Sequence, residues 1–170
     1  SFHFLLDSKN EMIPSWINLE NFFDFLAGFI DSDGSVMLKR RGIYVDFSIR
    51  FFGQNLNLLM EIKKLLEDLS YHSSVHLCHP KGYKRFKDGV LFKYNKDYHI
   101  LETKRGKQAV QLLNLVPIRH PEKILKRNLI YKIYNHKIIH WDKVENEVKE
   151  LRLLIKEAVK SKKDLALINP

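Results

Sequence analysis

The sequence has only one cysteine, Cys78, in 170 residues. One thiol excludes an intramolecular disulfide and a multi-cysteine zinc site. No apolar run approaches the roughly 20 residues that span a bilayer, and the N-terminus SFHFLLDSKNEM has neither the basic start nor the cleavage site of a signal peptide. We therefore expect a soluble intracellular protein, in a prokaryotic cytoplasm or an organelle, that is not secreted.

Glycine and proline are also scarce, with 7 and 5 residues, while 45% of the residues are hydrophobic. This composition is typical of a folded globular protein and not of a disordered chain. The sequence shows no internal repeat and no low-complexity segment. We expect a single domain over 1–170, with a core at about 18–135 and a helical extension at about 136–170.

Acidic residues are fewer than basic ones: the sequence has 20 Asp and Glu and 29 Lys and Arg, which gives a formal net charge of +9. Such an excess favours a polyanionic partner, since each neutralised phosphate releases condensed counterions. Charge alone does not distinguish DNA from RNA or from an acidic membrane.

Hydrophobic periodicity predicts an α+β fold. Helical spacing is expected over 18–32, where Asn18 would be the N-cap, and over 55–69, 104–115, 121–135 and 142–160. Alternation predicts a hairpin over 35–54 that turns at Arg41-Gly42, and strands at 72–80 and 98–103 joined by a basic, aromatic connection. This order indicates an antiparallel sheet with helices on one face. The last helix should face the core through Val144, Val148, Leu151, Ile155 and Val159.

The segment LAGFIDSDGS, residues 26–35, ends a helix on two carboxylates, Asp31 and Asp33. Carboxylates at the negative end of a helix dipole cost about 0.3–1 kcal/mol each unless a cation relieves them. A divalent metal with few carboxylate ligands and several waters would do so, as in magnesium sites that act on phosphates. Gly28 and Ser32 leave a groove on a stripe that Phe25 extends, and a second copy of the helix is the simplest partner for it.

The nine residues LAGFIDSDG resemble the signature of the LAGLIDADG homing endonucleases, with Phe29 in place of Leu and Ser32 in place of Ala. The expected elements also resemble the family's αββαββα core with a saddle-shaped antiparallel sheet, here with extra C-terminal helices. Family members with one motif act as homodimers, and this sequence contains one. A lone Asp-Ser-Asp-Gly would instead be interpreted as an acidic helix stop before Gly34.

This resemblance implies that two signature helices pack together through Phe25, Gly28 and Ser32. Each helix would deliver Asp33 to a shared Mg²⁺ cluster over the scissile phosphates, with the backbone carbonyl of Ser32 as a further ligand. Mn²⁺ or Ca²⁺ would substitute in binding. By the same matching, Asp31 would cap or brace the turn.

The resemblance also implies two residues at the edge of the active site. A polar residue after the second strand, here Gln54, would position the attacking water. A basic residue after the third helix would assist the nucleophile or the leaving group; Lys123 matches best and Arg119 remains a rival. Alternatively, Gln54 is an ordinary residue at the start of a helix, and Lys123 and Arg119 are ordinary solvated cations; these interpretations are equally simple.

The polar face of the sheet should read DNA, because strands can enter the major groove and present side chains to base edges. The candidates on the first hairpin are Lys39, Arg41, Tyr44, Asp46, Ser48 and Arg50. Those on the second hairpin and its connection, which we expect to order on binding, are Lys81, Lys84, Arg85, Lys87, Lys93 and Lys96. A merely solvated charged face is the alternative.

Two other patterns are weaker. His76, Cys78 and His79 resemble zinc ligands in type, yet alternation along a strand separates their faces. The segment YNHKIIH, with His136 and His140, has the residue types of a His-Asn-His nuclease without its spacing.

The sequence therefore favours a homodimeric, magnesium-dependent, site-specific DNA endonuclease. By the resemblance, it would be intron-encoded and would cut a long pseudo-palindromic site across the minor groove, leaving short 3′ overhangs. Two alternatives stay open on the same scaffold. One is an RNA-binding intron maturase, with intron RNA as its partner, and the other is a catalytically inactive DNA-binding regulator.

Overall fold

A four-stranded antiparallel sheet forms the centre of the molecule, in the order β1-β2-β6-β3. The computed structural model describes residues 12–87, 89–103 and 106–168. The sheet strands are β1 (Gly34–Arg41), β2 (Tyr44–Gly53), β3 (Ser73–His79) and β6 (Tyr98–Thr103), and β4 (Lys84–Lys87) pairs with β5 (Val90–Lys93) as a separate hairpin.

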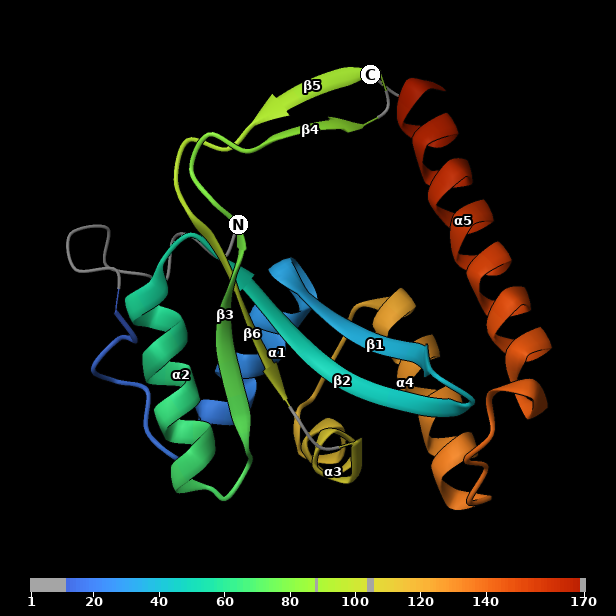
Figure 1. Cartoon of the computed structure of the whole chain (residues 1–170), viewed down its shortest axis with the longest axis horizontal. Helices are drawn as coiled ribbons and strands as arrows, with labels where there is room; N and C mark the ends of the chain where they lie inside the picture. The colour runs from blue at the N-terminus through green and yellow to red at the C-terminus, as the bar shows by residue number, and fades with distance from the viewer. Residues whose placement is uncertain (1–11, 88, 104–105, 169–170) are drawn as a thin grey trace.

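The helices are α1 (Phe22–Asp33), α2 (Leu56–Asp68), α3 (Gly106–Leu115), α4 (Pro121–Asn135), the 3-10 helix η2 (Trp141–Lys143) and α5 (Glu145–Ile168). Helices α1 and α4 lie behind the sheet in Figure 1, α3 is seen end-on below β2, and α2 packs beside β3 and β6. The other face of the sheet is open toward the viewer. This arrangement confirms the predicted α+β fold. None of the described helices is both long and apolar enough to cross a membrane.

The core lies between the helices and one face of the sheet. Antiparallel pairing places Val36 opposite Ile49, and both side chains are buried. From α1, Phe22, Leu26 and Ile30 are fully buried against this layer. Each fully buried side chain of this size contributes about 1.5–3 kcal/mol to folding, so the end of α1 is held firmly to the sheet.

The opposite face of the sheet carries polar side chains, as alternation in the sequence predicted. Register places Lys39 opposite Asp46 and Arg41 opposite Tyr44. Because paired residues point to the same side of a sheet, the six candidates of the first hairpin share one face.

The start of α1 differs from the prediction that Asn18 caps it. The Asn18 side chain accepts hydrogen bonds from the backbone N–H groups of Glu20 and Asn21, at 3.0 and 3.2 Å. These bonds close a short turn, and the helix begins only at Phe22. Asn18 thus bonds the backbone as a cap residue would, but it does so one turn before the helix begins.

The connection between β3 and β6 contains the β4–β5 hairpin, which the sequence pattern did not reveal. Both strands have four residues, too few to establish an alternating pattern, and Gly89 turns the chain with φ of 80°. Figure 1 shows this hairpin projecting beyond the sheet. We call it the β4–β5 arm. The first two residues of the helix predicted at 104–115 lie outside the described residues.

Helix α5 is longer than predicted and faces the core only at its start. Val144, just before the helix, and Val148 are buried, whereas Leu151 and Ile155 are half-buried. The side chain of Val159 lies outside the described side chains. Figure 1 shows α5 leaving the body of the molecule, so a stripe predicted to be core-facing is only partly covered.

Candidate functional site

The end of α1 is fixed to the start of α4 by Asp31. Its two carboxylate oxygens accept hydrogen bonds from the backbone N–H groups of Arg119, at 2.8 Å, and His120, at 3.0 Å. His120 immediately precedes the first residue of α4, so the carboxylate lies at the positive end of that helix dipole. In this structure Asp31 therefore braces the turn, and its oxygens are engaged in the chain's own backbone.

Lys123 supplies the cation that the negative end of α1 requires. It lies in the first turn of α4 and is 8% exposed. Its ammonium group donates to the carbonyl of Ile30 and, at 2.9 Å, to the carbonyl of Asp31. The charged donor therefore bonds two carbonyls in the last turn of α1, and the Ile30 carbonyl also accepts from the backbone N–H of Gly34.

Burial lowers the pKa of Lys123 below its ordinary value, while the carboxylates of Asp31 and Asp33 act in the opposite direction. The side chain therefore lies beneath the end of α1, close to Asp33. The rival basic candidate, Arg119, is exposed and uses only its backbone in the contact with Asp31. The structure brings both candidates to one place, with Lys123 buried and Arg119 on the surface.

Asp33 is the last residue of α1 and is exposed to solvent. No described residue donates a hydrogen bond to its carboxylate, in contrast to Asp31. Gly34 then enters β1, and a Cβ added there would lie 2.6 Å from the Cα of Ile30. Only glycine permits this close passage from helix to strand, and the passage determines where the Asp33 carboxylate emerges.

Two further side chains lie at this end of the sheet. Gln54 is exposed and follows the last residue of β2, directly before Asn55, whose side chain caps α2. Tyr98 begins β6, and its pKa is raised by burial and then by the nearby Asp33 carboxylate. Sequence reasoning did not identify Tyr98, because a tyrosine at the start of a strand carries no distinctive motif.

One chain alone offers few ligands to a metal ion. No group of three or more His, Cys, Asp or Glu side chains gathers among residues 12–87, 89–103 and 106–168. The exposed Asp33 carboxylate fits the ligand chemistry of Mg²⁺, which binds through one or two carboxylates, waters and substrate phosphates. The Asp33 carboxylate therefore fits a magnesium ion whose other ligands are waters and substrate phosphates.

We call the stripe of α1 that carries Phe25, Gly28 and Ser32 its outer stripe, and these three residues differ in exposure. Phe25 is 5% exposed and packs against Phe22 and Phe29, with ring centroids 6.5 Å apart in each pair. It packs in the chain's own core, and its contribution to a dimer seam stays a prediction. Gly28 is half-buried and Ser32 is exposed. Gly28 and Ser32 are therefore the two residues of this stripe that leave small side chains at the surface of α1.

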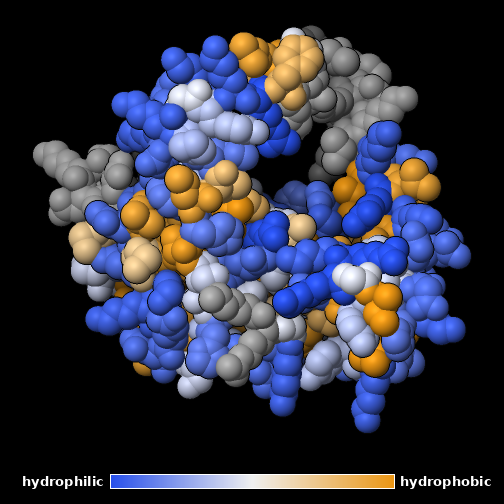
Figure 2. Space-filling model, in the orientation of Figure 1, coloured by the Kyte–Doolittle hydropathy of each residue, from blue (hydrophilic) through white to orange (hydrophobic). Residues whose placement is uncertain are grey.

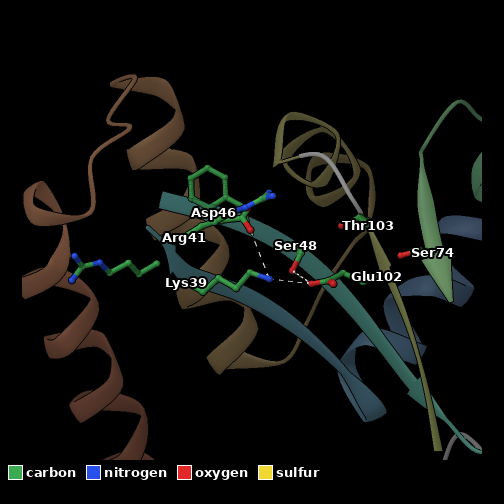
Figure 3. Close-up of a pocket in the computed structure, with 9 residues that line it drawn as sticks. Lys39, Arg41, Asp46, Ser48, Ser74, Glu102 and Thr103 are labelled. Atoms are coloured by element: carbon green, nitrogen blue, oxygen red, sulfur yellow. Dashed lines mark hydrogen bonds and ion pairs between the residues drawn. The ribbon is translucent and has the colours of Figure 1, made fainter. Parts of the chain in front are cut away.

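A network of charged side chains crosses the polar face of the sheet (Figure 3). Its centre is Glu102 of β6, whose Oε1 accepts from Ser48 Oγ at 2.7 Å, Arg50 Nε at 2.8 Å and Lys39 Nζ at 3.4 Å. Lys39 also pairs with Asp46 at 3.7 Å. Burial raises the pKa of Glu102, but the bonds from Ser48 and Arg50 outweigh it and hold the pKa below its ordinary value. All of its members except Arg50 line a hollow of about 460 Å³.

Arg41 and Tyr44 lie at the other end of this hairpin, and both are exposed. Tyr44 lies against His140, with ring centroids 5.5 Å apart, so the chain after α4 contacts the polar hairpin. The whole set of six predicted residues on the first hairpin thus extends along one open face.

The β4–β5 arm and its base carry most of the other predicted cations. Exposed positions are Lys81, Lys84, Arg85, Lys93 and Lys96, whereas the side chain of Lys87 lies outside the described side chains. Figure 2 shows hydrophilic side chains over much of the visible face and a hollow beneath the arm. At the base of the arm, the ring of His79 stacks on Tyr83 at 4.5 Å, and Tyr94 and Tyr98 lie beside them. The former zinc candidate His79 is therefore part of an aromatic cluster.

Comparison with known families identifies the class of protein. The family model for a LAGLIDADG-like domain matches residues 21–112, more than half of the chain, and the chain belongs to this family. The match includes α1, the whole sheet and the arm, but ends before α4 and Lys123. No curated protein matches the chain.

The family comprises homing endonucleases and related maturases, its nucleases generally use divalent metals, and membership indicates DNA binding.

Proposed function

We propose that this protein is a homodimeric, magnesium-dependent, site-specific DNA endonuclease encoded within an intron. It would hydrolyse phosphodiesters of both strands across the minor groove of a long pseudo-palindromic site and leave short 3′ overhangs. The observation that carries the proposal is the exposed Asp33 carboxylate, which ends a rigidly held helix at the margin of an open, polar sheet face.

Asp33 would hold the metal, with the backbone carbonyl of Ser32 as a further ligand. When bound, the ion would neutralise charge on the scissile phosphate and lower the pKa of a bound water. The chain's contribution is positioning: Asp31 and Lys123 fix the end of α1 through four contacts to backbone atoms. An exposed carboxylate on a rigid support loses little conformational entropy on binding a metal.

Gln54 would orient the attacking water, since it is exposed at the end of β2 and close in register to the start of β6. Arg119 would act as the mobile cation of the site, facing the phosphate backbone. Lys123 would act through the carbonyls of α1, as a positioning residue, because its ammonium group is buried and engaged there.

A second copy would complete the site. Gly28 and Ser32 lie one turn apart on the outer stripe of α1 and permit close approach of another helix. Two copies joined there would bring two Asp33 carboxylates together and align two polar sheet faces along one duplex. The dimer would carry twice the formal charge of +9, which favours binding to DNA.

The test is incubation of the protein with a duplex that carries its own intron insertion site, with and without Mg²⁺. We expect specific double-strand cleavage only with the metal, and loss of cleavage in Asp33→Asn. Intact DNA, together with magnesium-dependent binding of the intron RNA, would contradict the proposal and favour a maturase.

A further inference from the structure

Glu102 is an unexpected residue on a face that is proposed to bind a polyanion. It lies on β6, opposite Arg50 of β2 and Ser74 of β3, and so occupies the middle of the polar face. A carboxylate there repels phosphate, and burial of its side chain to 19% exposure adds a desolvation cost. A neutral acceptor would also bond Ser48 and Arg50, so these hydrogen bonds alone do not explain why a carboxylate stands at this position.

The contacts of Glu102 are one-sided. All three donors, from Lys39, Ser48 and Arg50, bond to Oε1. Within the described part of the chain, no donor bonds to Oε2. The carboxylate borders the hollow in the polar face, so an acceptor with a fixed position is available to a molecule lying there. Three donors on one oxygen leave the side chain little freedom to turn away.

Arg50 has the complementary arrangement. Its Nε is bonded to Glu102 at 2.8 Å, and in the described residues its two terminal amino groups have no hydrogen-bond partner. A guanidinium held at Nε keeps its terminal N–H groups aligned for a further acceptor. A fixed acceptor and a fixed donor pair therefore lie side by side on adjacent strands.

Base edges in the major groove match this pair selectively. Guanine presents two acceptors, O6 and N7, which suit the arginine fork, and cytosine presents the N4 amino donor, which suits a carboxylate. Adenine also has an amino donor, but its N7 acceptor lies beside it and would repel a carboxylate. Thymine offers an acceptor and a methyl group, and neither can bond to Oε2.

Resting on the proposed function, we propose that Glu102 is a specificity-determining residue that selects cytosine, through Oε2, at one position of the DNA site while it holds Arg50 toward a guanine. Its negative charge also weakens binding to duplexes that lack this cytosine, because the carboxylate is then left facing acceptors. The residue thus contributes by rejecting wrong sequences as well as by bonding the right one.

The experiment compares wild type and Glu102→Gln on a library of randomised duplexes, followed by sequencing of the bound fraction. Affinities are then measured for the selected duplex and for the same duplex with cytosine replaced. For wild type we expect one position that requires cytosine, where replacement weakens binding by about 10- to 100-fold. Glu102→Gln should reduce this penalty to within about 3-fold while the preferences at other positions persist.

Two further variants separate the role of Glu102 from that of charge. Glu67→Gln removes one carboxylate from the exposed side of α2, where it pairs with Lys63 at 2.7 Å, and should keep the cytosine requirement. Asp46→Asn removes a carboxylate from the same sheet face and one of the two partners of Lys39, and it leaves the contact between Arg50 and Glu102 in place. Since Asp46 is itself a candidate for reading DNA, it should change preferences at a different position of the site and keep the cytosine requirement. If Asp46→Asn relaxed the cytosine position as much as Glu102→Gln, face charge alone would explain the effect and the inference would be wrong.

Failure of this inference and failure of the proposed function give different results in this experiment. A wild type that selects a sequence, and a Glu102→Gln variant that keeps the same cytosine penalty, would overturn this inference and leave the proposed function standing. A wild type that selects no sequence at all would overturn both.

Discussion

Lys123→Met tests whether the buried lysine holds the end of α1. Methionine keeps most of the unbranched side chain and its packing, but removes the ammonium group that donates to the carbonyls of Ile30 and Asp31. A hydrogen bond from a charged donor contributes about 1.5–3 kcal/mol, and a buried carbonyl left without a partner costs about 1–3 kcal/mol. Relief of the desolvation cost of the ammonium offsets part of this loss.

We therefore expect Lys123→Met to lower the free energy of unfolding by about 2–4 kcal/mol. Urea denaturation followed by circular dichroism measures this value, and the slope against urea should stay unchanged because the same surface unfolds. Lys126→Met is the matched control. Lys126 lies on the same helix and pairs with Glu122 one turn away, a contact worth about 0.3–0.5 kcal/mol. Equal losses of under about 1 kcal/mol in both variants would refute the reasoning.

Three further predictions concern the same site and the sheet face. Asp31→Ala should lower the free energy of unfolding by about 1–3 kcal/mol, because two backbone N–H groups lose their acceptor. Asp33→Ala should change the free energy of unfolding by less than about 1 kcal/mol. Similar losses for the two variants in urea denaturation would contradict the division of roles between Asp31 and Asp33. Gly28→Leu should prevent dimerisation by holding the outer stripes of α1 apart, and a variant that sediments as a dimer and cuts DNA would show that the seam lies elsewhere. The pKa of Glu102 is lower in the folded chain than its ordinary 4.5, so its ionised form stabilises the fold above that pH and this contribution is lost as the pH falls through the folded value. The stability difference between wild type and Glu102→Gln should therefore shrink on acidification, and a constant difference down to about pH 3 would contradict this.

Periodicity was enough to predict the sheet, because alternation between buried and polar residues is a local property. Val45, Phe47 and Ile49 face one way along β2, and Asp46, Ser48 and Arg50 face the other. The turn at Gly42, with φ of 63°, followed from the same pattern. Four-residue strands give no such signal, which is why the β4–β5 arm was missed.

The site was predictable only where a motif or a local rule marked it. The position of Asp33 at the end of α1 followed from its sequence neighbours. The role of Lys123 did not, since its partners, Ile30 and Asp31, lie about 90 residues earlier. Glu102 was missed because its importance comes from cross-strand contacts over 50 or more residues. The burial of Phe25 within its own chain could not be predicted, because an apolar residue on a helix stripe can face either its own core or a partner.

The central claim is that Asp33 carries the metal-dependent chemistry while Asp31 and Lys123 only support it. The most direct measurement is the rate of magnesium-dependent cleavage of the insertion-site duplex by wild type and Asp33→Asn, with duplex binding measured in parallel. The account predicts that Asp33→Asn folds and binds the duplex as wild type does but leaves both strands intact. A variant that cuts the duplex at the wild-type rate would contradict it.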